Sequence, residues 1–323
     1  MATAEQIKAL IKSHFGDDSE RFITIALQVA AHEAQQGHGE LAHEIRLIVD
    51  KAGQDKRSAV VLKFPQDLRG LVVLETQTVP LTALIVPKPL RSRIERVIHE
   101  HRQQEKLKSH GLSHRRKILL TGPPGTGKTM SARVLAHELR LPLYTIQVDK
   151  LVTKFMGETS AKLRQIFDLI QEKTGVYLFD EFDAIGGERT LETDVGEMRR
   201  VLNSFLQFIE QDTSDSLIVA ASNSPKLLDR ALYRRFDDVL YYDRPRADDR
   251  KRLLQNVLGS FSPPDLNAAS IIRASSGLSH AEIDQACRDA IKHAILSERQ
   301  TVTPQLLLQM VNERQAAHRG RQR

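Results

Sequence analysis

The stretch "GPPGTGKT", Gly122 to Thr129, is the strongest chemical signal in the sequence. It follows the apolar run "KILLT" and precedes a segment with helical spacing, so it matches G-x-x-x-x-G-K-[ST] in the setting of a phosphate-binding loop. Small residues let backbone N–H groups turn inward around phosphate oxygens. Lys128 can then reach the β- and γ-phosphates, and Thr129 can offer its hydroxyl to Mg²⁺. The residues expected to bind the nucleotide are Gly122, Pro123, Pro124, Gly125, Thr126, Gly127, Lys128, Thr129 and Met130.

Two adjacent carboxylates form the second element of the predicted site. The run "VYLFDE" has the composition of a buried strand and ends in Asp180 and Glu181. Open α/β sheets bind ligands at the carboxyl ends of their strands, so both side chains should reach the site. We expect Asp180, with Thr129, to bind Mg²⁺, and Glu181 to orient and deprotonate the attacking water. The alternative, a pair of surface solubility groups, is disfavoured by the four apolar residues before them.

Two further segments carry candidate catalytic residues. The run "LIVAASN" ends in Asn223, whose amide could position the same water. The segment "LLDRALYRRFDD" places Arg234 and Arg235 on a short polar turn before another strand. An arginine supplied to a neighbour's γ-phosphate can raise the rate by about 10³ to 10⁵. The alternative is a surface salt bridge to Asp237 or Asp238, worth about 0 to 1 kcal/mol.

These residues lie at the ends of regularly spaced apolar runs. Beyond Arg116 the runs "KILLTG", "LYTIQV", "VYLFDE", "LIVAAS" and "VLYY" alternate with helical segments such as 130–139 and 197–210. Short continuous apolar strands that alternate with helices indicate a parallel sheet covered on both faces. We therefore expect an α/β fold with a five-stranded parallel sheet flanked by helices. After "DRPRADDR" the pattern becomes helical again.

The flanking segments suggest further domains. Apolar spacing from about residue 4 to residue 51 predicts a small helical module, and polar residues follow it. We expect a helical N-terminal partner-binding domain at 1–55, a linker and lead-in at 56–116, and the large α/β domain at 117–243. A helical lid domain should occupy 244–312, and a basic, disordered tail 313–323.

Composition excludes several classes of protein. The chain has 323 residues, and its single cysteine, Cys287, rules out an internal disulfide; helical spacing predicts that it is buried. No stretch approaches the 18 or so apolar residues of a membrane span, so we expect a cytoplasmic protein. Lys and Arg number 47 against 41 Asp and Glu, a surplus of +6. That surplus permits nucleic-acid contact, although a solvated surface explains it more simply.

The order and spacing of these motifs resemble the AAA family of ATPases. "GPPGTGKT", "VYLFDE", "IVAASN" and "RRFDD" are similar to its Walker A, Walker B, sensor-1 and arginine-finger segments. The resemblance covers about Phe64 to Arg314. It implies a P-loop NTPase with ATP and Mg²⁺ as ligands, in a homo-oligomeric ring, usually a hexamer. The arginines would then act in trans. Many members carry their two fingers three residues apart, around a Pro-Gly pair. Here the two arginines are adjacent, and we favour Arg235, which directly precedes Phe236.

The same resemblance extends to two other segments. "GLSHAEI", Gly277 to Ile283, is similar to a signature of the family's lid domain, with His280 in place of the usual glycine. Ala281 stands where other branches carry a sensor-2 arginine, so no such arginine is expected. In "KFMGE", Phe155, Met156 and Gly157 match the loop that faces the central pore and grips extended polypeptide. Without the resemblance, Phe155 would be interpreted as a core residue of the next helix. Residues 184–198 would form a second pore loop.

These features predict an ATP-driven machine that threads, unfolds or disassembles a protein partner, which the N-terminal helices would select. One alternative is a nucleic-acid motor or loader, favoured by the basic balance and disfavoured by the aromatic pore motif. Another is an ATP-switched assembly that regulates a partner enzyme. Similar compact AAA proteins occur beside subtilisin-like proteases in bacterial defence pairs, which would make a protease the partner.

Overall fold

The computed structural model describes residues 26, 29–30, 33, 38, 43–45, 47, 68, 70–76, 79–151, 159–186, 195–224, 228, 230–263 and 268–320. The predicted pore-loop residues Phe155, Met156 and Gly157 lie outside the described residues, as does most of the predicted N-terminal domain. Contacts divide the chain into two compact units, Met1–Lys63 and Phe64–Arg323. The strands and helices given below all belong to the second unit.

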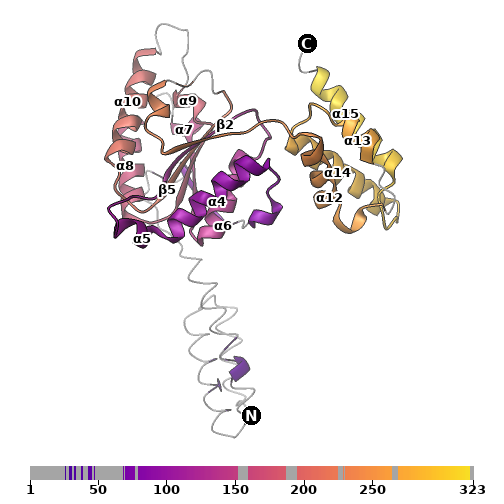
Figure 1. Ribbon diagram of the computed structural model, residues 1–323, viewed down its shortest axis with the longest axis horizontal. Helices are drawn as coiled ribbons and strands as arrows, with labels where there is room; N and C mark the ends of the chain where they lie inside the picture. The colour runs from indigo at the N-terminus through magenta and orange to yellow at the C-terminus, as the bar shows by residue number, and fades with distance from the viewer. Residues whose placement is uncertain are drawn as a thin grey trace. The chain divides into compact units, whose positions relative to one another are not determined.

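A six-stranded mixed sheet forms the centre of this unit (Figure 1). Its strands are β1 (Val72–Glu75), β2 (Lys117–Thr121), β3 (Leu143–Gln147), β4 (Val176–Asp180), β5 (Leu217–Ser222) and β6 (Asp238–Tyr241). Their order is β1-β3-β4-β5-β2-β6. Strands β2 to β6 are parallel, whereas β1 pairs antiparallel with β3, with Val72 opposite Ile146. The predicted α/β class is confirmed, but the prediction of five strands is corrected to six, because β1 lies in the segment interpreted as a lead-in.

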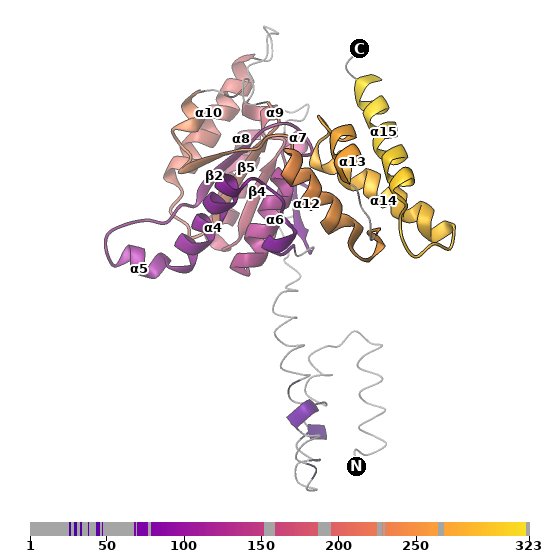
Figure 2. The same cartoon turned by 45° about the vertical axis from the view of Figure 1, so that its right-hand side comes forward.

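Helices cover both faces of the sheet (Figures 1 and 2). Helices α4 (Lys88–Arg102) and α6 (Lys128–Leu139) pack on one face, and α8 (Thr159–Glu172) and α10 (Val195–Gln211) on the other. The side chains of strand β4 alternate between the two faces of the sheet and so pack against the helices on both sides. Val176 and Leu178 join the core beneath α4 and α6. Phe179 instead packs against Phe167 of α8 and Phe205 of α10, with ring centroids 6.0 and 5.2 Å away.

Short helices lie between the strands and the longer helices. They are η2 (Leu81–Ala83), α5 (Gln104–Lys108), α7 (Val148–Leu151), α9 (Asp183–Gly186) and α11 (Arg230–Tyr233). Because β2 to β6 are parallel, the segments that follow them all leave from one edge of the sheet. The phosphate-binding loop, the Asp-Glu pair and Asn223 therefore lie at a common edge.

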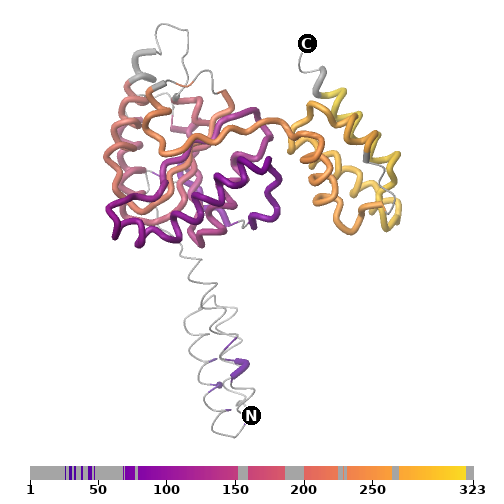
Figure 3. The backbone as a smooth tube through the Cα atoms, viewed as in Figure 1, coloured from indigo at the N-terminus to yellow at the C-terminus, as the bar shows by residue number. Residues whose placement is uncertain are grey.

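After β6 the chain enters a group of helices (Figure 3). These are α12 (Ala247–Leu258), α13 (Ala268–Ala274), α14 (His280–Leu296) and α15 (Pro304–Gly320), with the short helix η5 (Gly259–Phe261) after α12. They bury their own apolar core, which includes Leu254, Ile271 and Ile283. Cys287 is fully buried in it, as predicted, and burial raises the pKa of its thiol to about 12.

The expected disordered tail is corrected by the extent of α15. This helix continues to Gly320, although the tail was expected to begin at residue 313. Side-chain contacts explain the difference. Arg314 forms an ion pair with Asp289 of α14 at 2.6 Å, and the Gln315 amide donates to the Ala274 carbonyl at 3.0 Å. The surplus of positive charge in this segment is therefore partly neutralised within the chain.

Within the described part of the chain, no helix is both long and apolar enough to cross a lipid bilayer.

Candidate active site

The phosphate-binding loop is held tightly between two strands. Gly122 leaves β2 with a φ of 150°, and its N–H donates to the Ser222 carbonyl of β5 at 3.2 Å. A Cβ atom at Gly122 would lie 2.1 Å from the carbonyl oxygen of Tyr242, just beyond β6. Only glycine fits at this position, because the obstacle is backbone rather than a movable side chain.

Lys128 opens α6 with its ammonium group turned back into the loop. Its Nζ donates to the carbonyls of Gly122 and Pro123 at 2.7 and 2.8 Å. Burial lowers the pKa of Lys128, while the carboxylates of Asp180 and Asp183 oppose that shift. The loop therefore surrounds a cation that phosphate oxygens could bind in exchange for the two carbonyls.

Thr129 and Asp180, the two predicted metal ligands, are hydrogen-bonded to each other. The Thr129 hydroxyl donates to Asp180 Oδ2 at 3.0 Å, although the two residues lie 51 positions apart in the sequence. A hydroxyl and a carboxylate at this distance suit Mg²⁺, which binds few protein oxygens and takes its other ligands from phosphate and water. Among the residues that the structure describes, no group of three or more His, Cys, Asp or Glu side chains could hold a metal ion. The donor set thus fits Mg²⁺ bound together with a nucleotide.

Glu181 has an unusual backbone conformation. Its φ is 51°, in the left-handed region, and its side chain is exposed. Its N–H donates to Asp180 Oδ1 at 3.0 Å, and the next N–H, that of Phe182, donates to the Ala221 carbonyl at 2.8 Å. Such a conformation costs about 1 to 3 kcal/mol in a residue other than glycine and is common at functional sites. Here it occurs at the residue that directly follows the last residue of β4, Asp180.

Asn223 is held in position by a carboxylate that the sequence analysis did not identify. The backbone N–H of Asn223 donates to Asp183 Oδ1 at 3.2 Å. Asp183 lies in the first turn of α9, three residues after Asp180, and its charge also acts on Lys128. The spacing D-E-F-D was visible in the sequence, but the contact joins residues 40 positions apart.

The two arginines come just before β6 and so lie where the parallel strands begin, whereas the phosphate-binding loop of the same chain lies where these strands end. Asp237, next to them, accepts hydrogen bonds at 2.9 Å from the backbone N–H groups of Arg116 and Lys117, where β2 begins. The loop starts only after β2 ends. Four residue steps at about 3.3 Å each separate the two ends of β2 by about 13 Å. The arginines therefore do not converge with the other candidate residues within one chain.

Arg234 and Arg235 have different surroundings. Arg235 forms an ion pair with Glu210 at the end of α10. Arg234 is exposed, and within the described residues its side chain makes no hydrogen bond or ion pair. Asp238 pairs instead with Arg93, so neither Asp237 nor Asp238 neutralises the arginines as the salt-bridge alternative required.

Helix α14 contacts the phosphate-binding loop directly. The N–H of Ala281 donates to the Gly125 carbonyl at 3.0 Å. A Cβ atom at Gly125 would lie 2.7 Å from Ser279 Oγ, which leaves no room for a side chain there. The adjoining cavity measures about 810 Å³, within the usual range for ligand sites.

The cavity also includes residues that the sequence analysis did not identify. They come from the segment before α4, from α6, from α12 and from α14: Val79, Ala83, Leu84, Ile85, Arg133, Leu253, Asn256, Val257, Asp284, Arg288 and Ile291. Only "GLSHAEI" gave a signal for this wall, because isolated apolar residues on other elements carry no motif.

Comparison with known proteins identifies the family. Residues 118–244 match the model of the ATPase family associated with various cellular activities (AAA). An uncharacterized AAA family ATPase of Sinorhizobium fredii is 34% identical over 316 residues, which cover 94% of this chain and 92% of that relative. The chain therefore belongs to the AAA family of ATPases, and the predicted ATPase activity agrees with that membership.

Other relatives match over shorter stretches. A proteasome-activating nucleotidase of Methanothermobacter thermautotrophicus is 34% identical over 202 residues, 60% of this chain and 49% of that protein. The ATP-dependent zinc metalloprotease FtsH 1 of Methylacidiphilum infernorum is 35% identical over 183 residues, 54% of this chain and 28% of that protein. This chain thus spans half or less of the length of these two relatives.

Proposed function

We propose that this chain is the subunit of a ring, most simply a hexamer, that hydrolyses Mg-ATP to remodel or unfold a protein partner. The strongest support for the nucleotide chemistry is the convergence of Lys128, Thr129, Asp180, Glu181 and Asn223 at one edge of the sheet.

Each residue at this edge has a role that fits its geometry. Lys128 exchanges its two carbonyl partners for phosphate oxygens. Thr129 and Asp180 would hold Mg²⁺, which when bound offsets charge on the β- and γ-phosphates. Glu181 accepts a proton from water as that water attacks the γ-phosphorus and the bond to the β-phosphate oxygen breaks. Asn223, fixed by Asp183, positions the water.

A second copy of the chain completes the site. Arg234 cannot serve its own phosphate-binding loop from the opposite sheet edge, but it is exposed and can project toward a neighbour. We assign the trans role chiefly to Arg234, because Arg235 is already paired with Glu210. This assignment differs from the preference for Arg235 drawn from the sequence.

Protein remodelling is supported by the relatives and by the sequence after β3. One relative activates a proteasome and another is an ATP-dependent protease, as their names state. Phe155 and Met156 are large apolar residues beside a glycine, suited to holding polypeptide of any sequence by nonpolar contact. The partner would be a protein, and a separate protease that receives the unfolded chain is one form it could take.

The test is to trap the Glu181→Gln protein with ATP, image the assembly and identify the proteins that co-purify. A ring with polypeptide in its central pore supports threading, and a protease bound to the ring would identify the downstream partner. Nucleic acid in the pore, together with DNA-stimulated hydrolysis, would favour the motor alternative instead. An assembly with an empty pore and a partner bound only on its outside would favour an ATP-switched regulator.

Phe155→Ala gives a second, independent measurement. It should retain ATPase activity and lose client remodelling, since the change removes the apolar contact and leaves the nucleotide site intact. Unchanged remodelling by Phe155→Ala would contradict the threading proposal.

A further inference from the structure

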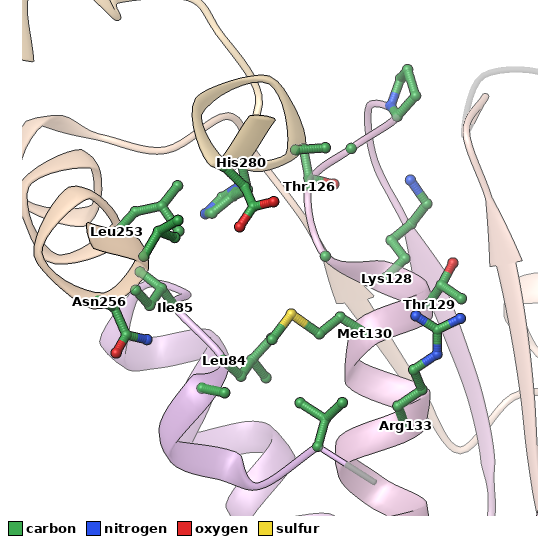
Figure 4. A pocket seen from close by; sticks show the side chains of 18 of the residues that line it. Leu84, Ile85, Thr126, Lys128, Thr129, Met130, Arg133, Leu253, Asn256 and His280 are labelled. Carbon is green, nitrogen blue, oxygen red and sulfur yellow. The ribbon is translucent and has the colours of Figure 1, made fainter. Parts of the chain in front are cut away.

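The cavity beside the phosphate-binding loop has two chemically different ends. In Figure 4, Lys128 and Thr129 lie on one side, and Leu253, Asn256 and His280 lie on the other. The first side carries the cation and the predicted metal ligands. The second side is mostly apolar, with walls from the segment before α4, from α12 and from α14. A nucleotide whose phosphates occupy the first side would place its flat aromatic base toward the second.

His280 is fixed in this second side by the backbone around it. It is the first residue of α14, and the helix N-cap is Ser279. Ser279 forms a capping box with Glu282: the Glu282 carboxylate accepts from the Ser279 N–H at 2.7 Å, and Ser279 Oγ accepts from the Glu282 N–H at 3.3 Å. The next residue, Ala281, donates to the Gly125 carbonyl at 3.0 Å. His280 therefore has little freedom to move away from the loop or the cavity.

The imidazole of His280 borders the cavity with both of its ring nitrogens covered. Both ring nitrogens are shielded from solvent and make no well-formed hydrogen bond with the described residues. Burial lowers the pKa of His280, although the nearby Asp249 carboxylate and Ile85 carbonyl favour the protonated ring. His280 is only partly buried, but both of its ring nitrogens are covered. The exposed surface of the residue therefore belongs to atoms other than these nitrogens. Such a surface suits van der Waals contact with a base better than hydrogen bonding to it.

We propose that His280 forms a wall of the base-binding part of the cavity and limits which substituents the base of a bound nucleotide can carry. This proposal rests on the nucleotide site of the proposed function and adds a residue that determines its substrate specificity. The side chain occupies space that a smaller residue would leave open between Leu253, Ile85 and the phosphate-binding loop (Figure 4). We expect ATP to bind beside it, whereas an enlarged base should collide with it.

The test compares wild type, His280→Ala and His280→Gly with four substrates. These are ATP and ATP analogues enlarged at one position of the base: a benzyl group on the exocyclic amine, or a phenyl group at C2 or at C8. The two variants should raise kcat/KM for at least one enlarged analogue by about tenfold or more relative to ATP, the range in which pocket contacts discriminate. Affinity measured by competition with a fluorescent nucleotide should change in the same direction.

Two comparisons keep the result interpretable. His293→Ala removes an exposed histidine from the same helix, outside the cavity, and should leave all substrate ratios unchanged. An analogue enlarged on the ribose, not on the base, tests whether the ribose lies beside His280 instead of the base. No gain for any base-enlarged analogue, or a gain only for the ribose-enlarged one, would overturn the role of His280. Failure of the wild type to hydrolyse ATP would instead overturn the function on which the role depends.

Discussion

Arg234→Ala is expected to abolish ATP hydrolysis while leaving ATP binding intact. Arg234 is exposed, without a partner in the described chain, at the sheet edge opposite its own phosphate-binding loop. Its charge would therefore act at a neighbour's γ-phosphate, where loss of such an arginine lowers kcat by about 10³-fold or more. That loss corresponds to about 4 kcal/mol of transition-state stabilisation. Phosphate release at saturating ATP measures the loss, and a fluorescent nucleotide measures binding.

Arg235→Ala is the matched control. Its side chain and that of Glu210 are 34% and 51% exposed, so their ion pair contributes at most about 1 kcal/mol to stability. We therefore expect Arg235→Ala to fold and to lose much less activity than Arg234→Ala. Glu210→Gln, which breaks the same pair from the other side, should reproduce the small effect of Arg235→Ala. If Arg235→Ala loses much more activity than both Arg234→Ala and Glu210→Gln, Arg235 is the catalytic arginine; if the two arginine variants lose equally, both arginines are required.

Mixed assemblies separate action in trans from a role within one chain. Arg234→Ala subunits keep Glu181, and Glu181→Gln subunits keep Arg234. In a random equal mixture, one boundary in four unites an intact site with an intact arginine, so activity should recover to about a quarter of the wild-type rate per subunit. Size measurement and subunit exchange of labelled protein confirm that the two variants co-assemble. Co-assembly without any recovery would refute the reasoning.

Three further outcomes are expected. Gly122→Ala should destabilise the protein by about 1 to 3 kcal/mol in urea unfolding, since the new methyl group meets the Tyr242 carbonyl; a neutral effect would disprove that close approach. Glu181→Gln should bind ATP and lose turnover, and a wild-type rate of phosphate release would remove Glu181 from its role. Burial lowers the pKa values of His101 and His114. Their contribution to the free energy of unfolding should therefore be fully present above about pH 6.5 and be lost as the pH falls further, because the unfolded chain then binds more protons than the folded one. Urea unfolding between pH 7.5 and 5.5 measures this decline, which should be shallower when both histidines are replaced by glutamine.

Local patterns in the sequence predict strands β2 to β6 and the phosphate-binding side of the candidate site. The runs that became β2 to β6 are continuous apolar segments bounded by turn residues, and each is long enough to be recognised alone. The phosphate-binding loop is equally local, since its glycines and Lys128 lie within eight residues. Thr129 and Asp180 are both predicted to bind Mg²⁺, and the hydrogen bond between them is consistent with that prediction.

The missed features depend on contacts between distant residues. Strand β1 has only four residues, and its pairing with β3 about 70 positions later leaves no periodic signal. The contact of Asp183 with Asn223 and the ion pair of Arg235 with Glu210 likewise join residues that lie on different elements of the chain. For the tail, basic composition suggested disorder, but Arg314 finds a carboxylate on α14 that no local pattern indicates. Pairing of charges across helices outweighs composition here.

Strand β2 belongs to two active sites at once if subunits assemble through the arginine turn. Its first residues hold that turn through Asp237, and its last residue leads into the loop that binds this subunit's own nucleotide. A shift of the loop on hydrolysis would therefore be transmitted along five buried or half-buried residues to the arginine that serves the next subunit. Since the nucleotide loop follows β2 and the arginine turn lies at its start, the nucleotide bound to one subunit would affect the neighbour on one side and not the neighbour on the other. In a closed ring, the influence of one subunit on the next would therefore run in a single direction.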